Sequence, residues 1–294
     1  MALNKEVFKT RALSSLFFVI IMLFGLLYNH WSFFLLFSII HFGCWREYLR
    51  LLEKIFGVKY HLFIKMGLAI AGYGMMLSFC TPAYNIGGYG IKENGYLPLT
   101  LAGFILFAAG ILQKESSLSF KNFGAAALGW LYISVSCGMM LGLRQVGILW
   151  KDNFYLDLGR EYPLLLVLSM WANGTFAYLV GSFLGKTPFS KISPKKTWEG
   201  TIGGFLLCII VMGTLGSLII TGSMGWEAAA IAAVAGITGT LGDLLESKLK
   251  RVADVKDSGT MLPGHGGFLD RFDSLLVATP FVFLLVRFIL APPL

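Results

Sequence analysis

The chain alternates between long apolar runs and short polar segments. A helix needs about 20 mostly apolar residues to cross a bilayer. Runs of roughly this kind recur along the whole chain, although the second and fourth are short. We therefore predict nine membrane-spanning helices, near residues 12–28, 31–45, 62–81, 97–112, 125–143, 163–184, 201–221, 226–245 and 275–291. The pattern predicts an all-α fold, that of a polytopic integral membrane protein.

In two of the polar segments, the order of apolar and polar residues predicts a particular local structure. The stretch "GLLYNHWSFF" predicts a tight helical hairpin with Asn29 and His30 at its tip. In the segment 46–61, "REYLRLLEKIFGVKYH", an apolar face with charges around it is formed by Leu49, Leu52 and Ile55. This arrangement is typical of a helix that lies in the membrane interface.

The basic residues of the loops predict the orientation of the chain. Lys5, Lys9 and Arg11 favour a cytosolic N-terminus, because positively charged loops stay on the cytosolic side. Nine crossings then place the remaining basic loops on that same side. These loops are 46–61, 113–124, 185–200 and 246–274.

Composition agrees with a membrane protein and narrows its partners. Only 14% of the residues are charged, whereas a soluble domain carries about 25%. The net charge of +8 is confined to short segments between apolar runs. Anionic lipid headgroups and phosphorylated substrates are therefore the expected partners, and nucleic acid is not. The four cysteines are scattered and are expected to be apolar core residues rather than metal ligands or disulfides.

One helix carries polar residues at regular spacing near the end of the eighth span. If this helix continues past Leu241, then Asp243, Ser247, Lys250 and Arg251 share one face, at i, i+4, i+7 and i+8. An acid at the membrane edge is costly unless it is paired or binds a cation. Asp243 is thus either a functional acid or one half of a salt bridge to Lys250 or Arg251.

The next segment, "GTMLPGHGGFLDRFDS", combines glycines with acids. Its glycines would let the backbone around His265 approach a ligand closely. Asp270 and Asp273 follow at i and i+3, with Arg271 between them. Hard cations such as Mg²⁺ prefer carboxylate oxygens and share their coordination with substrate phosphates. Asp243 and Asp270 suit that task, whereas a lone loop histidine more often only donates or accepts a hydrogen bond.

A second cluster, "SPKKTWEG", precedes the seventh span. We expect Ser193 to cap this helix, Pro194 to open it, and Lys195 and Lys196 to lie in its first turn. Basic residues are disfavoured at a helix N-terminus unless an anion binds there, and phosphate is favoured. The alternative is that the lysines only mark the cytosolic side. The nearby "GSFLGKT" is one residue short of a P-loop and follows an apolar helix, so we reject that interpretation.

These motifs together resemble a known family, the phosphatidate cytidylyltransferases (CDP-diacylglycerol synthases). The family signature reads S-x-x-K-R, then K-D, then P-G-H-G-G-x-x-D-R-x-D, and "SPKKTWEG" and "GDL" at 242–244 are similar to further family motifs. The resemblance covers 165–290 strongly, whereas the first 160 residues match only as membrane helices. The matching signature residues are Ser247, Lys250, Arg251, Lys256, Asp257, Pro263, Gly264, His265, Gly266, Gly267, Asp270, Arg271 and Asp273.

The resemblance implies a fold, a reaction and a location. It implies about nine transmembrane helices, a cytosol-facing polar cavity, and transfer of the CMP moiety of CTP to phosphatidate with release of pyrophosphate. Mg²⁺ is the implied cofactor, with Asp243 and Asp270 as its ligands. The resemblance is also compatible with a second bound cation and with a homodimer. The expected setting is the bilayer of a bacterial inner membrane. Residues 1–160 would form the N-terminal transmembrane helices, and 161–294 a catalytic region.

The resemblance also suggests roles for single residues. The expected catalytic residues are Asp243, Asp270, Lys250, Arg251, Arg271, His265 and Asp273. The expected substrate-binding residues are Lys195, Lys196, Ser193, Thr197, Ser247, Lys256, Gly266, Gly267 and Asn173.

One position departs from the family pattern and keeps alternatives open. Gly174 follows Asn173 where the family usually has an aspartate, and glycine cannot replace a carboxylate. The chain could be an impaired or non-catalytic family member. It could also be a CTP-dependent transferase that acts on another lipid phosphate or a polyprenol. A transporter or channel would carry ionisable residues near the midplane, whereas here they gather at one edge.

Overall fold

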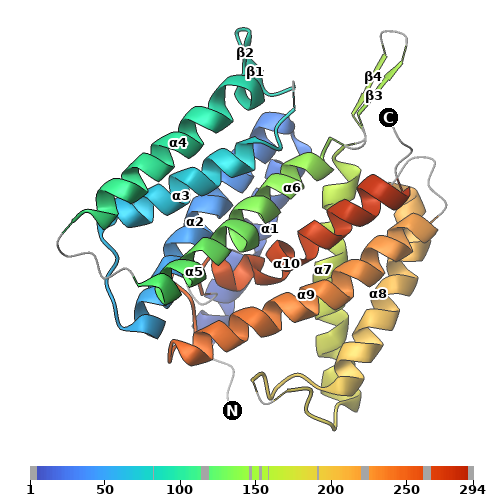
Figure 1. Ribbon diagram of the computed structural model, residues 1–294. Coiled ribbons are helices and arrows are strands. Elements are labelled where there is room, and N and C mark those ends of the chain that lie inside the picture. Colours follow the sequence, from blue (N-terminus) through green and yellow to red (C-terminus); the bar gives the residue numbers. More distant parts are fainter. Residues whose placement is uncertain are drawn as a thin grey trace. The chain divides into compact units, whose positions relative to one another are not determined.

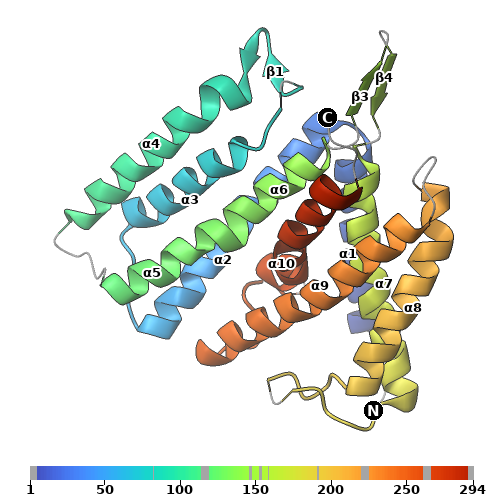
Figure 2. The same ribbon diagram turned by 45° about the vertical axis from the view of Figure 1, so that its right-hand side comes forward.

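The computed structural model describes residues 5–81, 83–113, 119–145, 148–151, 154–157, 159–190, 192–219, 225–260 and 266–290. Almost all of the regular structure is helical, and two small antiparallel hairpins complete it (Figures 1 and 2). The helices are α1 (Lys5–Leu27), α2 (His30–Phe56), α3 (Leu62–Leu77), α4 (Ile91–Ile111), α5 (Phe120–Gly129), η1 (Trp130–Val135), α6 (Ser136–Leu143), α7 (Glu161–Leu184), α8 (Trp198–Ile219), α9 (Trp226–Val252), α10 (Leu269–Leu285) and η2 (Val286–Leu290). The strands are β1 (Asn85–Ile86), β2 (Tyr89–Gly90), β3 (Ile148–Lys151) and β4 (Phe154–Asp157).

Each of the nine predicted spans falls on a helix or on helices that follow one another directly. Within the described residues, six helices are long and apolar enough to cross a membrane. They are Ile91–Ile111, Phe120–Leu143, Glu161–Leu184, Trp198–Gly216, Trp226–Val252 and Leu269–Leu290. The prediction of an all-α, polytopic integral membrane protein is thus confirmed, and the count of nine stays a prediction.

The chain forms two compact units, and each of them combines two separate stretches of the sequence. One unit comprises Met1–Leu141 and Leu249–Phe272, and the other comprises Gly142–Lys248 and Asp273–Leu294. Below we call them the first and the second unit. The predicted division into 1–160 and 161–294 follows the distribution of motifs and stays a prediction.

In the first unit, α2 supplies much of the core. Asn29 caps this helix, because its side chain accepts the amide of Ser32 at 2.7 Å while the Ser32 hydroxyl accepts the amide of Asn29. This confirms the predicted hairpin tip. The predicted interfacial helix is not a separate element. It is the second half of α2, and Leu49 and Leu52 are buried in the unit instead of facing lipid.

Close pairs of helices occur in both units, and small residues make them possible. In the first unit α3 runs beside α4, where a side chain at Gly103 would collide with the backbone of Ala71 (Figure 1). In the second unit α7 runs beside α8, and a side chain at Gly204 would collide with Ala177 (Figure 2). The cysteines are all free and buried, as expected of apolar core residues.

Two helices extend beyond the apolar runs that predicted them. The eighth span was expected to end near 245, but α9 continues to Val252. The last span was expected to begin near 275, but α10 begins at Leu269. Both extensions carry charged residues, because a helix needs apolar residues only where it meets lipid. These polar helix ends carry Asp243, Lys250 and Asp270, which belong to the two clusters described next.

Candidate functional site

The second unit contains a cavity of about 510 Å³ lined by residues from several parts of the sequence. Most of the wall comes from α7, from α9, and from the loop 185–197 that joins α7 to α8, and Thr201 of α8 and Ser274 of α10 complete it. The predicted site residues that line it are Asn173, Ser193, Lys195, Lys196, Thr197 and Asp243. The structure therefore unites the "SPKKTWEG" motif with the acid of the "GDL" motif in one cavity.

The central contact of this cavity is an ion pair between Lys196 and Asp243. Both side chains are about one-third exposed, and the Ser247 hydroxyl lies 3.5 Å from Oδ1 of Asp243. Partial burial lowers the pKa of Lys196 from its ordinary value, while the charge of Asp273 acts in the opposite direction. An ammonium group that has lost part of its water in this way gains from a negatively charged ligand.

This ion pair corrects one alternative interpretation of Asp243. A salt bridge to Lys250 or Arg251 on the same helix was considered, but the partner is Lys196, 47 residues earlier in the chain. Ser247 was expected on the same face as Asp243, and the short distance between them agrees with that expectation. The partner of Asp243 thus comes from the loop before α8 and not from α9 itself.

The loop that carries the two lysines is ordered by contacts to the start of α8. Glu199 accepts the backbone amides of Lys186 and Thr187 at 3.1 Å. Thr197 caps the helix, since its hydroxyl accepts the amide of Gly200 at 3.2 Å. The expectation that Ser193 caps α8 is therefore wrong, and Lys195 and Lys196 lie in a turn before the helix rather than in its first turn.

Gly174 opens directly onto the cavity. Apart from its chain neighbours and the backbone of its own helix, no described atom lies within 4 Å of the position that a Cβ would occupy there, so a side chain would project into open space. The neighbouring Asn173 also lines the cavity, and its Oδ1 is buried without a hydrogen-bond partner among the described residues. This wall therefore has room for a carboxylate at 174 and a free acceptor at 173.

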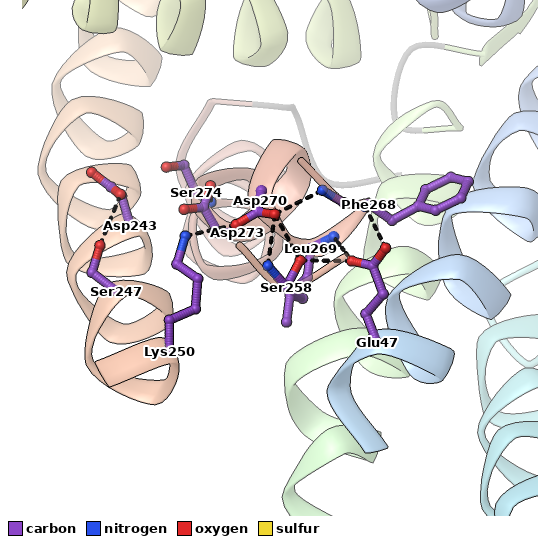
Figure 3. A network of polar contacts seen from close by, with 11 residues as sticks. Glu47, Asp243, Ser247, Lys250, Ser258, Phe268, Leu269, Asp270, Asp273 and Ser274 are labelled. Atoms are coloured by element: carbon purple, nitrogen blue, oxygen red, sulfur yellow. Dashed lines mark hydrogen bonds and ion pairs between the residues drawn. The ribbon is translucent and has the colours of Figure 1, made fainter. Parts of the chain in front are cut away.

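A second polar cluster lies in the first unit, around Asp270 (Figure 3). Lys250 donates to Oδ1 of Asp270 at 2.6 Å, and both side chains are largely buried. Oδ2 accepts the amide of Ser258 at 2.9 Å, its hydroxyl at 2.9 Å, and the amide of Gly267 at 2.7 Å. Asp270 is thus a charged group with nearly all of its hydrogen-bonding capacity in use.

Glu47 of α2 completes this cluster, and the sequence analysis missed it. Its carboxylate accepts the Ser258 hydroxyl at 2.7 Å and the amides of Phe268 and Leu269 at 3.0 and 2.9 Å. One signal in the sequence points to it, because Glu47 lies on the same helical face as the buried Cys44 and Leu51. An acid on an apolar face needs partners, but the sequence alone does not say which.

The two signature glycines make room for these acids. Gly266 has φ +82°, a conformation that favours glycine, and a Cβ there would meet the Asp270 carboxylate at 2.5 Å. A Cβ at Gly267 would collide with the carboxylate of Glu47. Their lack of side chains is therefore explained by contacts inside the protein, and their predicted contact with substrate stays a prediction.

The remaining predicted residues have varied surroundings. Arg251 and Arg271 are exposed, and Asp273 is buried in the second unit. Lys256 lines a pocket of about 300 Å³ in the first unit, together with Arg50 and Lys54 of α2. His265 lies outside the described residues, as do Pro263 and Gly264.

Asp243 and Asp270, the two predicted metal ligands, supply carboxylate oxygens, the donor type that a hard cation prefers. Within the described residues, no group of three or more His, Cys, Asp and Glu side chains is arranged to hold a metal ion. Asp243 and Asp270 each face an ammonium group, however, from Lys196 and Lys250. Each carboxylate therefore already stands beside one positive charge, and each offers the hard oxygen donors that Mg²⁺ prefers.

The fold and the cavity define a class, that of polytopic helical membrane proteins with a basic, carboxylate-containing cavity suited to phosphate groups. The sequence pattern of the cytidylyltransferase family matches residues 9–289, and the chain therefore belongs to this family. The resemblance seen in the motifs is thereby confirmed.

Curated relatives carry the same family name. Phosphatidate cytidylyltransferase of Thermotoga maritima is 34% identical over 195 residues, 62% of this chain and 68% of the relative. Phosphatidate cytidylyltransferase 5, chloroplastic, of Arabidopsis thaliana is 33% identical over 209 residues, 65% of this chain and 51% of the relative. The Synechocystis phosphatidate cytidylyltransferase is 44% identical over 146 residues, 48% of each chain. The chain thus spans about half the length of some relatives and about two thirds of others.

Proposed function

We propose that this integral membrane protein transfers the CMP moiety of CTP to phosphatidate, giving CDP-diacylglycerol and pyrophosphate. The observation that carries the proposal is the cavity of the second unit. It is lined by Lys195, Lys196 and Asp243, together with Asn173 and Thr197. Basic groups beside a carboxylate suit a metal-bound triphosphate. The names of the curated relatives support the same substrates.

The reaction needs no covalent bond to the protein. A phosphate oxygen of phosphatidate would form a bond to the α-phosphorus of CTP. The bond from that phosphorus to the oxygen bridging to the β-phosphate would break, and pyrophosphate would leave. The attacking phosphate is already ionised near neutral pH, so a strong general base is unnecessary. Positioning and charge neutralisation can therefore supply most of the rate enhancement.

The basic residues would neutralise phosphate charge. Lys196 is the strongest candidate in the cavity, because its ammonium is partly desolvated. It would exchange its partner Asp243 for a phosphate ligand or contact both anions. Lys195 is exposed at the same cavity and would add a second charge. Lys250, beside Asp270, and the exposed Arg251 and Arg271 would act on the phosphates of the nucleotide, the lipid or the leaving pyrophosphate.

Mg²⁺ is the proposed cofactor. Asp243 of the second unit and Asp270 of the first unit are each proposed to supply a carboxylate oxygen to a cation. When bound, it would offset the charge that develops on the nucleotide phosphates. On Asp270 the oxygen available is Oδ1, which faces Lys250, because Oδ2 already accepts three hydrogen bonds. On Asp243 both Ser247 and Lys196 hold the carboxylate at the cavity wall.

The proposed setting is a bacterial inner membrane with the reaction on the cytosolic side. One substrate is dissolved in the bilayer and the other in the cytosol, so the chemistry belongs at the interface. The charged ends of α9 and α10, which extend past the apolar runs, suit that depth.

The test uses purified full-length protein with labelled CTP and phosphatidate in lipid–detergent micelles, with and without Mg²⁺. We expect CDP-diacylglycerol and pyrophosphate in equal amounts, only with the metal. Asp243→Asn should lower the rate by roughly 100-fold or more, because charge stabilisation at the reacting phosphates is lost. Glu227→Gln, which likewise replaces a carboxylate with an amide at the other end of α9, is the matched control and should retain the rate.

Assays with other acceptors distinguish the proposed function from its alternative, a CTP-dependent transferase that acts on another lipid phosphate or a polyprenol. Polyprenyl phosphate and other lipid phosphates replace phosphatidate in the same assay. A CTP-dependent product with one of these, and none with phosphatidate, would identify a related transferase. No nucleotide transfer to any acceptor would contradict the proposed activity.

A further inference from the structure

Glu47 is far from every motif that defines the family signature, yet it contacts the loop that carries one. Its partners, Ser258, Phe268 and Leu269, are 211 to 222 residues away in sequence. Glu47 is 7% exposed, so its charge is removed from water. A buried carboxylate is costly unless it is fully hydrogen-bonded. These three donors provide that compensation, all from one segment of the first unit.

The contacts of Glu47 fall on two places that matter for Asp270. Phe268 and Leu269 lie at the start of α10, where backbone amides have no partner within the helix. Glu47 accepts both amides and so fixes the beginning of the helix that carries Asp270. A negative charge at this helix end is also favoured by the helix dipole.

The third contact reaches Asp270 through one hydroxyl. The Ser258 Oγ lies 2.7 Å from Oε2 of Glu47 and 2.9 Å from Oδ2 of Asp270, so its one proton is shared between the two carboxylates (Figure 3). The amides of Ser258 and Gly267 add to the same Oδ2. Consequently Oδ2 is held on the side of the loop, and Oδ1 is directed to Lys250 at 2.6 Å.

The backbone around Glu47 is shaped to admit its carboxylate. A Cβ at Gly259 would collide with Oε1 of Glu47, and one at Gly267 would collide with both of its oxygens. Two glycines from the two sides of the loop thus leave the space that the carboxylate fills. The surrounding backbone is therefore shaped to fit this carboxylate, because an acid exposed to solvent would not require glycine at either position.

We propose that Glu47 is a positioning residue, which holds Ser258 and the start of α10 so that Asp270 presents Oδ1 to its cationic partner. The contact itself does not depend on the activity of the protein. Its consequence for catalysis rests on the proposed function, in which Oδ1 of Asp270 faces the cation at the phosphates.

The test compares Glu47→Gln with a matched control on the same helix. Glutamine has the same shape but offers one acceptor oxygen and a donor group, so it cannot satisfy three donors. Glu53→Gln is the control, since Glu53 of α2 pairs with Lys65 at 2.7 Å and has no contact with the loop among those described. Both variants are made in the full-length protein.

Two measurements read the outcome. Hydrogen exchange of the segment 266–270 should be about tenfold faster in Glu47→Gln and unchanged in Glu53→Gln, because bonds to a charged acceptor are lost. The kcat for CDP-diacylglycerol should fall by about 10- to 100-fold, as for other residues that orient a charged ligand. The KM for CTP should change by less than about twofold, since Glu47 does not line the cavity of the second unit.

Ser258→Ala keeps the proposal testable if Glu47→Gln does not fold. It removes the bridging hydroxyl but leaves the two amides on Glu47 intact. Its kcat should also fall, which tests the positioning role without Glu47→Gln. Where both single variants fold, the two losses should not add in the double variant, because both act through one contact.

Each alternative outcome overturns part of the idea in a recognisable way. Unchanged exchange at 266–270 in Glu47→Gln would refute the contact, whether or not the protein is an enzyme. Faster exchange with an unchanged kcat, or a fully active Ser258→Ala, would refute the positioning role. If the unsubstituted protein itself makes no CDP-lipid, the proposed function fails, and the exchange data still decide the contact.

Discussion

Single residues of this protein owe their roles to partners that lie far away in the chain. Asp243 has an ion pair with Lys196, and Asp270 one with Lys250. Sequence motifs singled out all four residues as charged groups of a candidate site. A pairing of Asp243 within its own helix was one of two alternatives that the sequence left open, and the structure shows instead a pairing with Lys196 of the loop before α8.

Gly174 gives a prediction at the residue scale. The place of its side chain is open and borders the cavity, so Gly174→Asp should fold normally and add a carboxylate near Lys195 and Lys196. We expect the rate of CDP-diacylglycerol formation to rise by about tenfold or more at low Mg²⁺, through stronger cation binding.

Gly174→Asn is the control for this change, since it has nearly the same size without the charge. It should not raise the rate. If Gly174→Asp is no more active than Gly174→Asn at any Mg²⁺ concentration, a carboxylate at this position is not used by the chain. An inactive unsubstituted protein together with an active Gly174→Asp would mean that the natural chain is an impaired family member.

At the scale of elements, apolar runs predicted where helices exist better than where they end. The nine runs all coincide with helices, because only a helix satisfies its own backbone in lipid. Their ends were misjudged where charged residues continue a helix, as in α9 and α10. The start of α8 was misjudged because Thr197, and not Ser193, caps it.

The α3–α4 pair offers a prediction about packing. A Cβ at Gly103 of α4 would meet the backbone of Ala71, which cannot turn aside as a flexible side chain could. Gly103→Ala should therefore lower stability by about 1–3 kcal/mol, the usual cost of overpacking. Chemical unfolding in detergent, followed by circular dichroism, measures the change.

Gly95→Ala is the matched substitution in the same helix. A Cβ at Gly95 would have its nearest neighbours at 3.7 and 3.8 Å, an ordinary contact distance. Alanine has a better helix propensity than glycine, so this variant should be as stable as the original chain or more stable, by up to about 1 kcal/mol. Equal effects of the two substitutions would show that close packing at Gly103 is not what matters.

At the scale of the whole molecule, the predicted membrane topology can be tested directly. Within the first unit, segments that were all predicted to be cytosolic touch one another. Tyr60 Oη donates to the carbonyl of Asn122 at 3.4 Å, and Glu47 contacts Ser258. These contacts are those expected of loops on one side of a membrane.

Labelling of introduced cysteines reads out this topology. Lys59→Cys and Lys256→Cys should react with an impermeant thiol reagent only from the cytosolic side, and Lys92→Cys only from the opposite side, because all three positions are exposed. The natural cysteines are buried and should give little background. Labelling of all three from one side would contradict the predicted number of crossings.

The sequence by itself determined that this protein is helical and membrane-embedded, and its motifs named the family and most of the charged residues of the site. Apolar length and helical period are local properties, so they can be read without knowing the fold. Only the tertiary structure decided which acid meets which base, that Thr197 begins α8, and that Glu47 belongs with Asp270. Such pairings join residues up to about 220 positions apart. They are set by how loops close over helix ends, which no local pattern records.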